Sequence, residues 1–237
     1  MHCITLVLLL LCAYRAVRTL HAAKVYRTFM ESLSELMVRV LCDEDPKDVD
    51  AIYSFSQTLC NEEAQIKKLH ELSMKYRHAV IIYSGEDGSR SCGWAGYRRF
   101  EERLKITGVS SSRLSVVPFP ETEKRINTLN ESIAVVDFCS SHAVRKLLVV
   151  APPFHQTRCT MTILSCVAKT MGQIDIYSAP SLADGWQKQV YHSQGILFGS
   201  RASLVRAELL RIWSYHLKGD LVSPDVAINI LNNRRYL

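Results

Sequence analysis

The chain has 237 residues, of which 48% are hydrophobic and 22% are charged, and its formal net charge is +6. This size and apolar content favour a folded domain of α/β dimensions and exclude a mainly disordered chain. The positive charge is spread along the sequence rather than gathered in a Lys/Arg block, which disfavours nucleic acid as a partner.

Residues 1–45 are expected to form an N-terminal helical segment. Its apolar stretch runs from Ile4 to Tyr14 and is followed by Arg15 and Arg18. The stretch is shorter than the ~20 apolar residues that span a bilayer. It favours either a signal or membrane-proximal anchor or a helix packed on the body of the protein. The localisation therefore stays open between cytoplasmic and membrane-associated.

Strand and helix patterns alternate over residues 46–220. Apolar strand patterns cover Val49–Phe55, Ala79–Tyr83, Leu114–Pro118, Lys146–Ala151 and Ile174–Ser178. Helical patterns cover Ala23–Leu41, Asn61–Lys75, Tyr97–Ile106, Thr128–Cys139, Thr157–Met171 and Ala202–His216. Such alternation is typical of a parallel sheet covered on both faces. We predict a Rossmann-like three-layer α/β sandwich with a mainly parallel sheet of about five strands.

Three details complete this prediction. The region after Ser178 is expected to be a loop, since Gly185 and Gly195 interrupt it. Residues 221–237 are expected to form a helical tail. Asn61 is the expected N-cap of the helix that it begins, because Asn accepts hydrogen bonds from exposed helical amides.

The eight cysteines contain no CxxC pair, and no Asp/His cluster has the spacing of metal ligands. We therefore expect no metal site. GxSxG, HExxH, P-loop and GxGxxG motifs are also missing, which excludes the enzyme classes that depend on them. Candidate site residues must instead be sought where strands end, because ligands of open α/β sheets bind beyond the carboxyl ends of the strands.

His155 and Arg158 are the first candidates, because they follow the predicted fourth strand at a spacing of three residues. An imidazole at such a position can act as a general acid or base or can pair with a phosphate. An arginine at the start of a helix favours anions. The alternative is a histidine that merely begins the helix and an arginine in solvent.

The start of the preceding helix offers Asn127, Thr128 and Glu131. Thr128 and Glu131 have the spacing of a capping box, which leaves Asn127 as the better candidate for ligand contact. Ser84 and Gly85 follow the second strand and form either the wall of a cleft or a surface turn. Further along, Arg206 and Glu208 are two residues apart on a helix, so at most one of them faces inward.

Several short motifs follow one another in an order that resembles the SanA/YdcF/ElyC family. They are Asp50-Ala51-Ile52, Ser84-Gly85, Glu101-Glu102 before Gly108-Val109, Asn127-Thr128 with Glu131, and His155 with Arg158. The resemblance extends over about Val49–Leu217 and implies a Rossmann-like fold. It also implies S-adenosylmethionine as a possible ligand and lipid-linked envelope precursors as another. The chain departs from the family at Ser54–Thr58, where members carry a glycine-rich turn.

We therefore expect a small-molecule-binding protein. If it is an enzyme, His155 and Glu131 are its expected catalytic residues. The ligand-binding residues are expected to be Ser84, Gly85, Asn127, Thr128 and Arg158. The ligand is expected to be anionic, either nucleotide-like or phosphorylated. The alternative is a non-catalytic, membrane-associated factor in envelope or membrane biogenesis, held at the membrane by the N-terminal segment.

Overall fold

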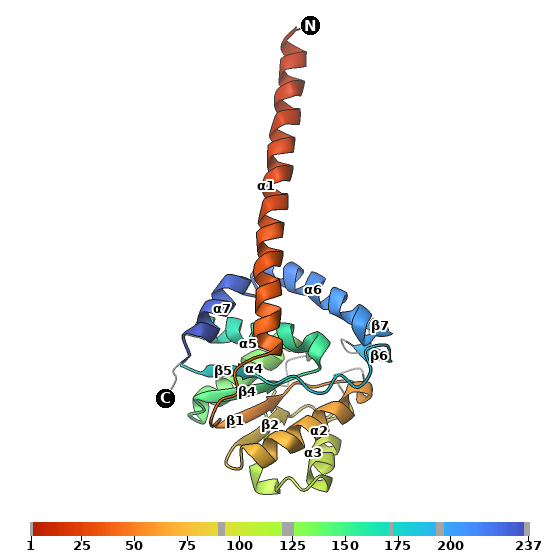
Figure 1. Cartoon of the computed structure of the whole chain (residues 1–237), viewed down its shortest axis with the longest axis vertical. Helices are drawn as coiled ribbons and strands as arrows, with labels where there is room; N and C mark the ends of the chain where they lie inside the picture. Colours follow the sequence, from red (N-terminus) through yellow and green to blue (C-terminus); the bar gives the residue numbers. More distant parts are fainter. Residues whose placement is uncertain (1, 90–92, 120–125, 171–172, 193–196, 235–237) are drawn as a thin grey trace.

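A computed structural model describes residues 2–89, 93–119, 126–170, 173–192 and 197–234, with side chains from residue 17 onward. It contains an α/β body from which the first part of a long N-terminal helix projects (Figure 1). The predicted α/β class is confirmed. The arrangement is a Rossmann-like three-layer sandwich around a single parallel sheet.

The central sheet has the strand order β3-β2-β1-β4-β5, and every neighbouring pair in it is parallel. Its strands are β1 (Ala51–Ser54), β2 (Val80–Ser84), β3 (Leu114–Val117), β4 (Lys146–Val150) and β5 (Asp175–Ser178). Four of them lie within the predicted strand patterns, and β2 ends at Ser84, one residue beyond its pattern. Because the middle strands are buried on both faces, they read as continuous apolar runs rather than as alternating ones.

Helices cover both faces of the sheet. The helices α2 (Leu59–Lys75) and α3 (Tyr97–Ile106) share one hydrophobic core with it. On the other face lie α4 (Thr128–Ser141), α5 (Pro153–Thr170) and α7 (Pro224–Asn232), together with the last part of α1 (His2–Leu41). The helix α6 (Arg201–Leu217) packs against α5. The chain therefore crosses from one face to the other between β3 and β4.

The region predicted to be a loop after the fifth strand contains an antiparallel pair, β6 (Gln189–His192) and β7 (Leu197–Ser200). The loop prediction is wrong for these eight residues. Each strand has only four residues, which is too short for a strong alternating pattern. The hairpin is held to the body by the Thr58 hydroxyl, which donates a 2.7 Å hydrogen bond to the carbonyl oxygen of Tyr191.

The N-terminal helix α1 packs on the body through its C-terminal part. Phe29, Leu33, Leu36 and Val40 repeat at helical spacing and are buried in the main core. Residues 17–28 are exposed where the helix leaves the body (Figure 1). Within the described part of the chain, no helix has the length and apolar character needed to cross a bilayer.

Candidate functional site

The main candidate site is a cavity of about 290 Å³ at the carboxyl ends of β1 and β4. These two strands are neighbours, and the chain continues from them in opposite directions, to β2 on one side and to β5 on the other. Such a switch point in the strand order is where open α/β sheets bind ligands. The cavity wall comes from the segment after β1, the first turns of α4 and α5, the hairpin strand β6, and α6 with the turn after it.

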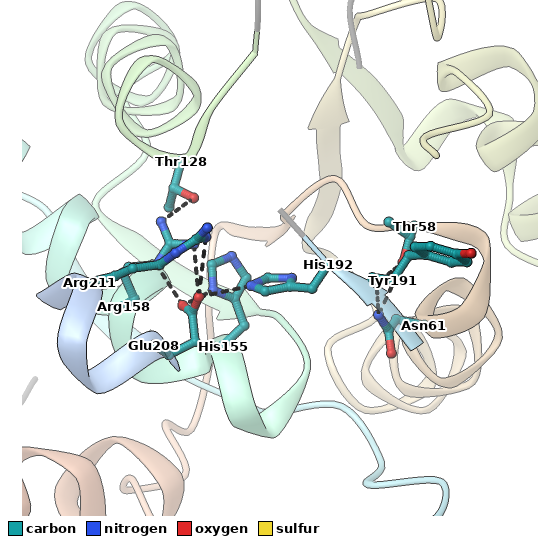
Figure 2. A network of polar contacts seen from close by, with 9 residues as sticks. All are labelled: Thr58, Asn61, Thr128, His155, Arg158, Tyr191, His192, Glu208 and Arg211. Atoms are coloured by element: carbon teal, nitrogen blue, oxygen red, sulfur yellow. Dashed lines mark hydrogen bonds and ion pairs between the residues drawn. The ribbon is translucent and has the colours of Figure 1, made fainter. Parts of the chain in front are cut away.

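The carboxylate of Glu208 is the centre of a buried polar network beside this cavity (Figure 2). Arg158 donates to it through Nε, at 2.6 Å from Oε2, and through Nη2, at 3.3 Å from Oε1. His155 Nδ1 lies 2.7 Å from Oε2, and His192 Nε2 lies 2.9 Å from Oε1. Arg211 Nη1 is 3.7 Å from Oε1. Three segments far apart in sequence thus meet at one carboxylate.

The helical periodicity of α6 places Glu208 in this network. Leu204 and Ile212 are buried four residues before and four residues after it, so Glu208 lies on the inward stripe of the helix. Arg206 is exposed on another face. The prediction that at most one of Arg206 and Glu208 faces inward is confirmed.

The charges in the network determine the protonation of Glu208. Burial by itself would raise the pKa of this carboxyl, but Arg158, His155 and His192 hold the pKa well below its usual range. The guanidinium of Arg158 is buried as well, and Glu208 raises its pKa against that burial. Glu208 and Arg158 therefore form a buried, hydrogen-bonded ion pair.

Both histidines are neutral in this environment. Burial and the neighbouring Arg158 lower the pKa of His155 to about 3, and burial lowers the pKa of His192. Because an ionised carboxylate only accepts hydrogen bonds, His155 donates to Glu208 from Nδ1, which leaves a lone pair on Nε2. Among the described residues, no side chain or backbone group bonds this Nε2, and His155 lines the cavity.

His155, His192 and Glu208 each offer one atom that could bind a metal ion, and these atoms lie within 4.8 Å of one another. Both oxygens of Glu208, however, already accept hydrogen bonds from the guanidinium of Arg158. An arginine remains charged at all ordinary pH values, so a metal ion here would be placed against a buried cation. The geometry favours an ion pair over a metal centre.

Glu131 is buried in another part of the cavity wall, with 4% of its surface exposed. Its Oε1 accepts hydrogen bonds of 2.7 Å from the Tyr53 hydroxyl and of 2.7 Å from the Ser56 amide. Burial raises the pKa of Glu131 to about 7, although these two hydrogen bonds, the Ser56 hydroxyl and the more distant Arg158 oppose the rise. A carboxyl with this pKa exchanges protons readily at neutral pH.

The capping box predicted for Thr128 and Glu131 is wrong, because Asn127 is the N-cap of α4. Its Oδ1 accepts from the amides of Leu129, at 2.9 Å, and Asn130, at 3.1 Å. Asn130 Oδ1 in turn accepts from the Asn127 amide at 2.7 Å. Thr128 is instead part of the network, since its hydroxyl accepts a 2.8 Å hydrogen bond from Arg158 Nη1. Asn127 and Thr128 both line the cavity, and Asn127 rather than Thr128 caps the helix.

Ser84 and Gly85 do not line this cavity, in contrast to the ligand contact expected of them. Ser84 is fully buried at the end of β2. A Cβ atom at Gly85 would lie 2.4 Å from Val116 Cγ1 and 2.8 Å from the Val117 carbonyl oxygen. Gly85 is therefore required for close packing of β2 against the end of β3.

Asn61 is not the N-cap of α2, which starts at Leu59 with Thr58 in the capping position. Asn61 is buried instead, and its Nδ2 donates to the Thr58 hydroxyl at 3.2 Å. Arg201 Nε donates to Asn61 Oδ1 at the same distance. These contacts join α2 to the start of α6. Thr58 and Asn61 lie beside Tyr191 of β6, the strand that also carries His192 (Figure 2).

The sequence interpretation missed three side chains of the cavity and its network, His192, Arg211 and Tyr215, and it gave little weight to a fourth, Glu208. His192 lies on a strand that was not predicted, and Arg211 and Tyr215 follow Glu208 on α6. The spacing of Glu208, Arg211 and Tyr215 by three and four residues places them on one helical face. That periodicity is the feature of the sequence from which Arg211 and Tyr215 could have been predicted to lie beside Glu208.

Comparisons with known proteins do not assign the chain to a family. No protein-family model matches the chain, and no curated protein matches it. The resemblance to the SanA/YdcF/ElyC family stays a prediction that rests on the quoted motifs.

Proposed function

We propose that the protein binds a small anionic ligand, phosphorylated or nucleotide-like, in the cavity at the ends of β1 and β4. The observation that carries this proposal is the convergence of three helix N-termini and two arginines on one cavity. The first turns of α4 and α5 line it, as does Thr58, the residue in the N-cap position of α2. The backbone dipole places about half a positive charge at each helix N-terminus, which favours an anion there even though Asn127 already caps the amides of Leu129 and Asn130 in α4.

Arg158 and Arg211 add full positive charge to the same wall. Glu208 pairs with the first, and Asp220 also lines the cavity, so the two arginines are partly balanced. The helix termini are not balanced in this way, because their charge comes from the backbone. The volume of about 290 Å³ lies near the lower limit for ligand sites, which favours a sugar phosphate or mononucleotide over a dinucleotide.

We further propose that His155 acts as a general base on such a ligand. Its neutral imidazole directs Nδ1–H to Glu208 and keeps the Nε2 lone pair for the cavity. When Nε2 accepts a proton from a hydroxyl or a water molecule, the carboxylate of Glu208 favours the imidazolium that forms, whereas burial and Arg158 oppose it. S-adenosylmethionine, which the family resemblance implies, belongs among the ligands to be tested.

The test is a thermal-shift series with inorganic phosphate, ribose 5-phosphate, AMP and S-adenosylmethionine. A ligand at a hundredfold excess over its Kd stabilises the folded state by about 2.7 kcal/mol. We expect Tm to rise with at least one phosphate compound, and to rise less in Arg211→Gln. The matched control is Arg206→Gln, which removes an exposed arginine of the same helix outside the cavity. Failure of every compound to shift the wild-type Tm would contradict the proposal.

Membrane association through the N-terminal segment is a second candidate function, and the projecting part of α1 favours it. From residue 1 to residue 30 the chain has four Lys/Arg residues and no Asp or Glu. A cationic helix with an apolar start is suited to the anionic surface of a bilayer. Sedimentation with vesicles of phosphatidylcholine alone, or with added phosphatidylserine, tests this. Binding that requires the anionic lipid supports it, and binding to neither counts against it.

A further inference from the structure

The carboxyl of Glu131 has one oxygen in use and one available. Its Oε1 accepts from the Tyr53 hydroxyl and the Ser56 amide, both at 2.7 Å. Among the residues that the structure describes, none donates a hydrogen bond to Oε2. The hydroxyl of Ser56 also lies beside this carboxyl and helps to lower its pKa. Since Ser56 and Glu131 both line the cavity, a hydroxyl of a bound ligand can donate to the same carboxyl.

A cationic donor is disfavoured at this position. Arg158 is close enough to lower the pKa of Glu131, and Arg211 lines the same cavity. An ammonium group beside Glu131 would be repelled by both guanidinium groups in a region of low dielectric constant. A neutral hydroxyl meets no such penalty, and it can pair with the carboxyl in either protonation state.

We infer that Glu131 binds a hydroxyl group of the ligand, so that the ligand is a polyol phosphate such as a phosphorylated sugar or a nucleotide with free ribose hydroxyls. This inference rests on the proposed function, because the arginines and helix N-termini must hold the phosphate. Carboxylates serve the same purpose in dinucleotide-binding folds, where they accept hydrogen bonds from ribose hydroxyls. Glu131 thereby becomes a specificity residue, which selects among anions that the rest of the cavity accepts.

The experiment compares three probes by calorimetry: ribose 5-phosphate, ethyl phosphate and inorganic phosphate. Ethyl phosphate carries the phosphate ester without free hydroxyls. We expect the wild type to bind ribose 5-phosphate at least tenfold more tightly than ethyl phosphate. In Glu131→Gln this preference should fall about tenfold, because a hydrogen bond to a charged acceptor is stronger than one to a neutral amide. The Kd for ethyl phosphate should stay unchanged.

Glu101→Gln is the matched control. Glu101 Oε2 accepts a 2.7 Å hydrogen bond from the Tyr83 hydroxyl, which repeats the Tyr53–Glu131 pair outside the cavity. This variant should keep the full preference for ribose 5-phosphate.

Equal affinity of the wild type for ribose 5-phosphate and ethyl phosphate would overturn the inference and leave the proposed function standing. The same holds if Glu131→Gln keeps the wild-type preference. If none of the three probes binds to the wild type, the proposed function fails and the inference fails with it.

Discussion

Two carboxyl groups beside one cavity, Glu131 and Glu208, are buried to nearly the same extent, with 4% and 2% of their surfaces exposed. Their pKa values nevertheless move in opposite directions, upward for Glu131 and downward for Glu208. Glu208 accepts hydrogen bonds from a guanidinium, whereas the hydrogen-bond donors of Glu131 are a tyrosine hydroxyl and a backbone amide. Burial is therefore common to both sites, and the charge of the neighbouring donors decides the protonation state.

The largest expected effect comes from removal of the cation beside Glu208. Arg158→Met should lower the free energy of unfolding by about 3–5 kcal/mol, because it leaves a buried carboxylate without its counterion. Urea unfolding at pH 7 measures this. Arg206→Met, an exposed position on α6, should have little effect. A loss below about 1 kcal/mol in Arg158→Met would mean that the ion pair contributes little to folding.

The next effect separates Glu131 from Glu208 by pH. The pKa of Glu131 is raised in the folded state, from 4.5 to about 7, so the unfolded state releases its proton first as pH rises. The contribution of this carboxyl to the free energy of unfolding of the wild type therefore falls by about 3 kcal/mol as pH rises from 4.5 to 7.

Glu131→Gln does not titrate, so its stability relative to the wild type should increase by about 2–3 kcal/mol from pH 5 to pH 8. Urea unfolding at the two pH values measures the difference. The same relative stability at both values would show that Glu131 is ionised throughout.

His155 should give a slope of the opposite sign. Its pKa is lowered in the folded state, from 6.5 to about 3, so the unfolded state takes up a proton first as pH falls. The stability that depends on neutral His155 is present above pH 6.5 and decreases below it, by about 2 kcal/mol at pH 5.

His155→Gln should therefore lose less stability than the wild type between pH 7 and pH 5, whatever its stability at pH 7. Equal losses in the two proteins would indicate that folding does not lower the pKa of His155. The stability contributed by Glu131 falls as pH rises, whereas the stability contributed by His155 increases. The two contributions therefore partly cancel in the wild type between pH 4.5 and pH 6.5. Glu131→Gln leaves the pH dependence due to His155, and His155→Gln leaves the pH dependence due to Glu131.

The smallest expected effect concerns the helix that carries Glu131. Asn127→Ala should destabilise the fold by about 1 kcal/mol, because the amides of Leu129 and Asn130 lose their acceptor. Asn127→Gly should cost only a few tenths of a kcal/mol, since glycine is a good N-cap. The comparison of the two variants in urea unfolding tests the role of the cap. If the destabilisation expected of Asn127→Ala appeared in Thr128→Ala instead, the assignment of Asn127 as the N-cap would be wrong.

Local pattern was sufficient to predict the five strands and the position of His155 and Arg158. A strand buried on both faces must be apolar along its length, and the residues that follow a parallel strand must lie at the carboxyl edge of the sheet. Both statements depend only on neighbouring residues. The same locality explains the errors at the start of α4, where Asn127 and Thr128 are both acceptable caps and only the backbone conformation distinguishes them.

The partners of the site were decided by tertiary packing. Glu208 follows Arg158 by fifty residues, and it reaches the guanidinium only because α6 packs against α5. His192 joins them through a four-residue strand that a hydrogen bond from Thr58 holds in place. The direction of each pKa shift depends in turn on these long-range contacts, because the energy of a buried charge is set by the groups that surround it rather than by its neighbours in sequence.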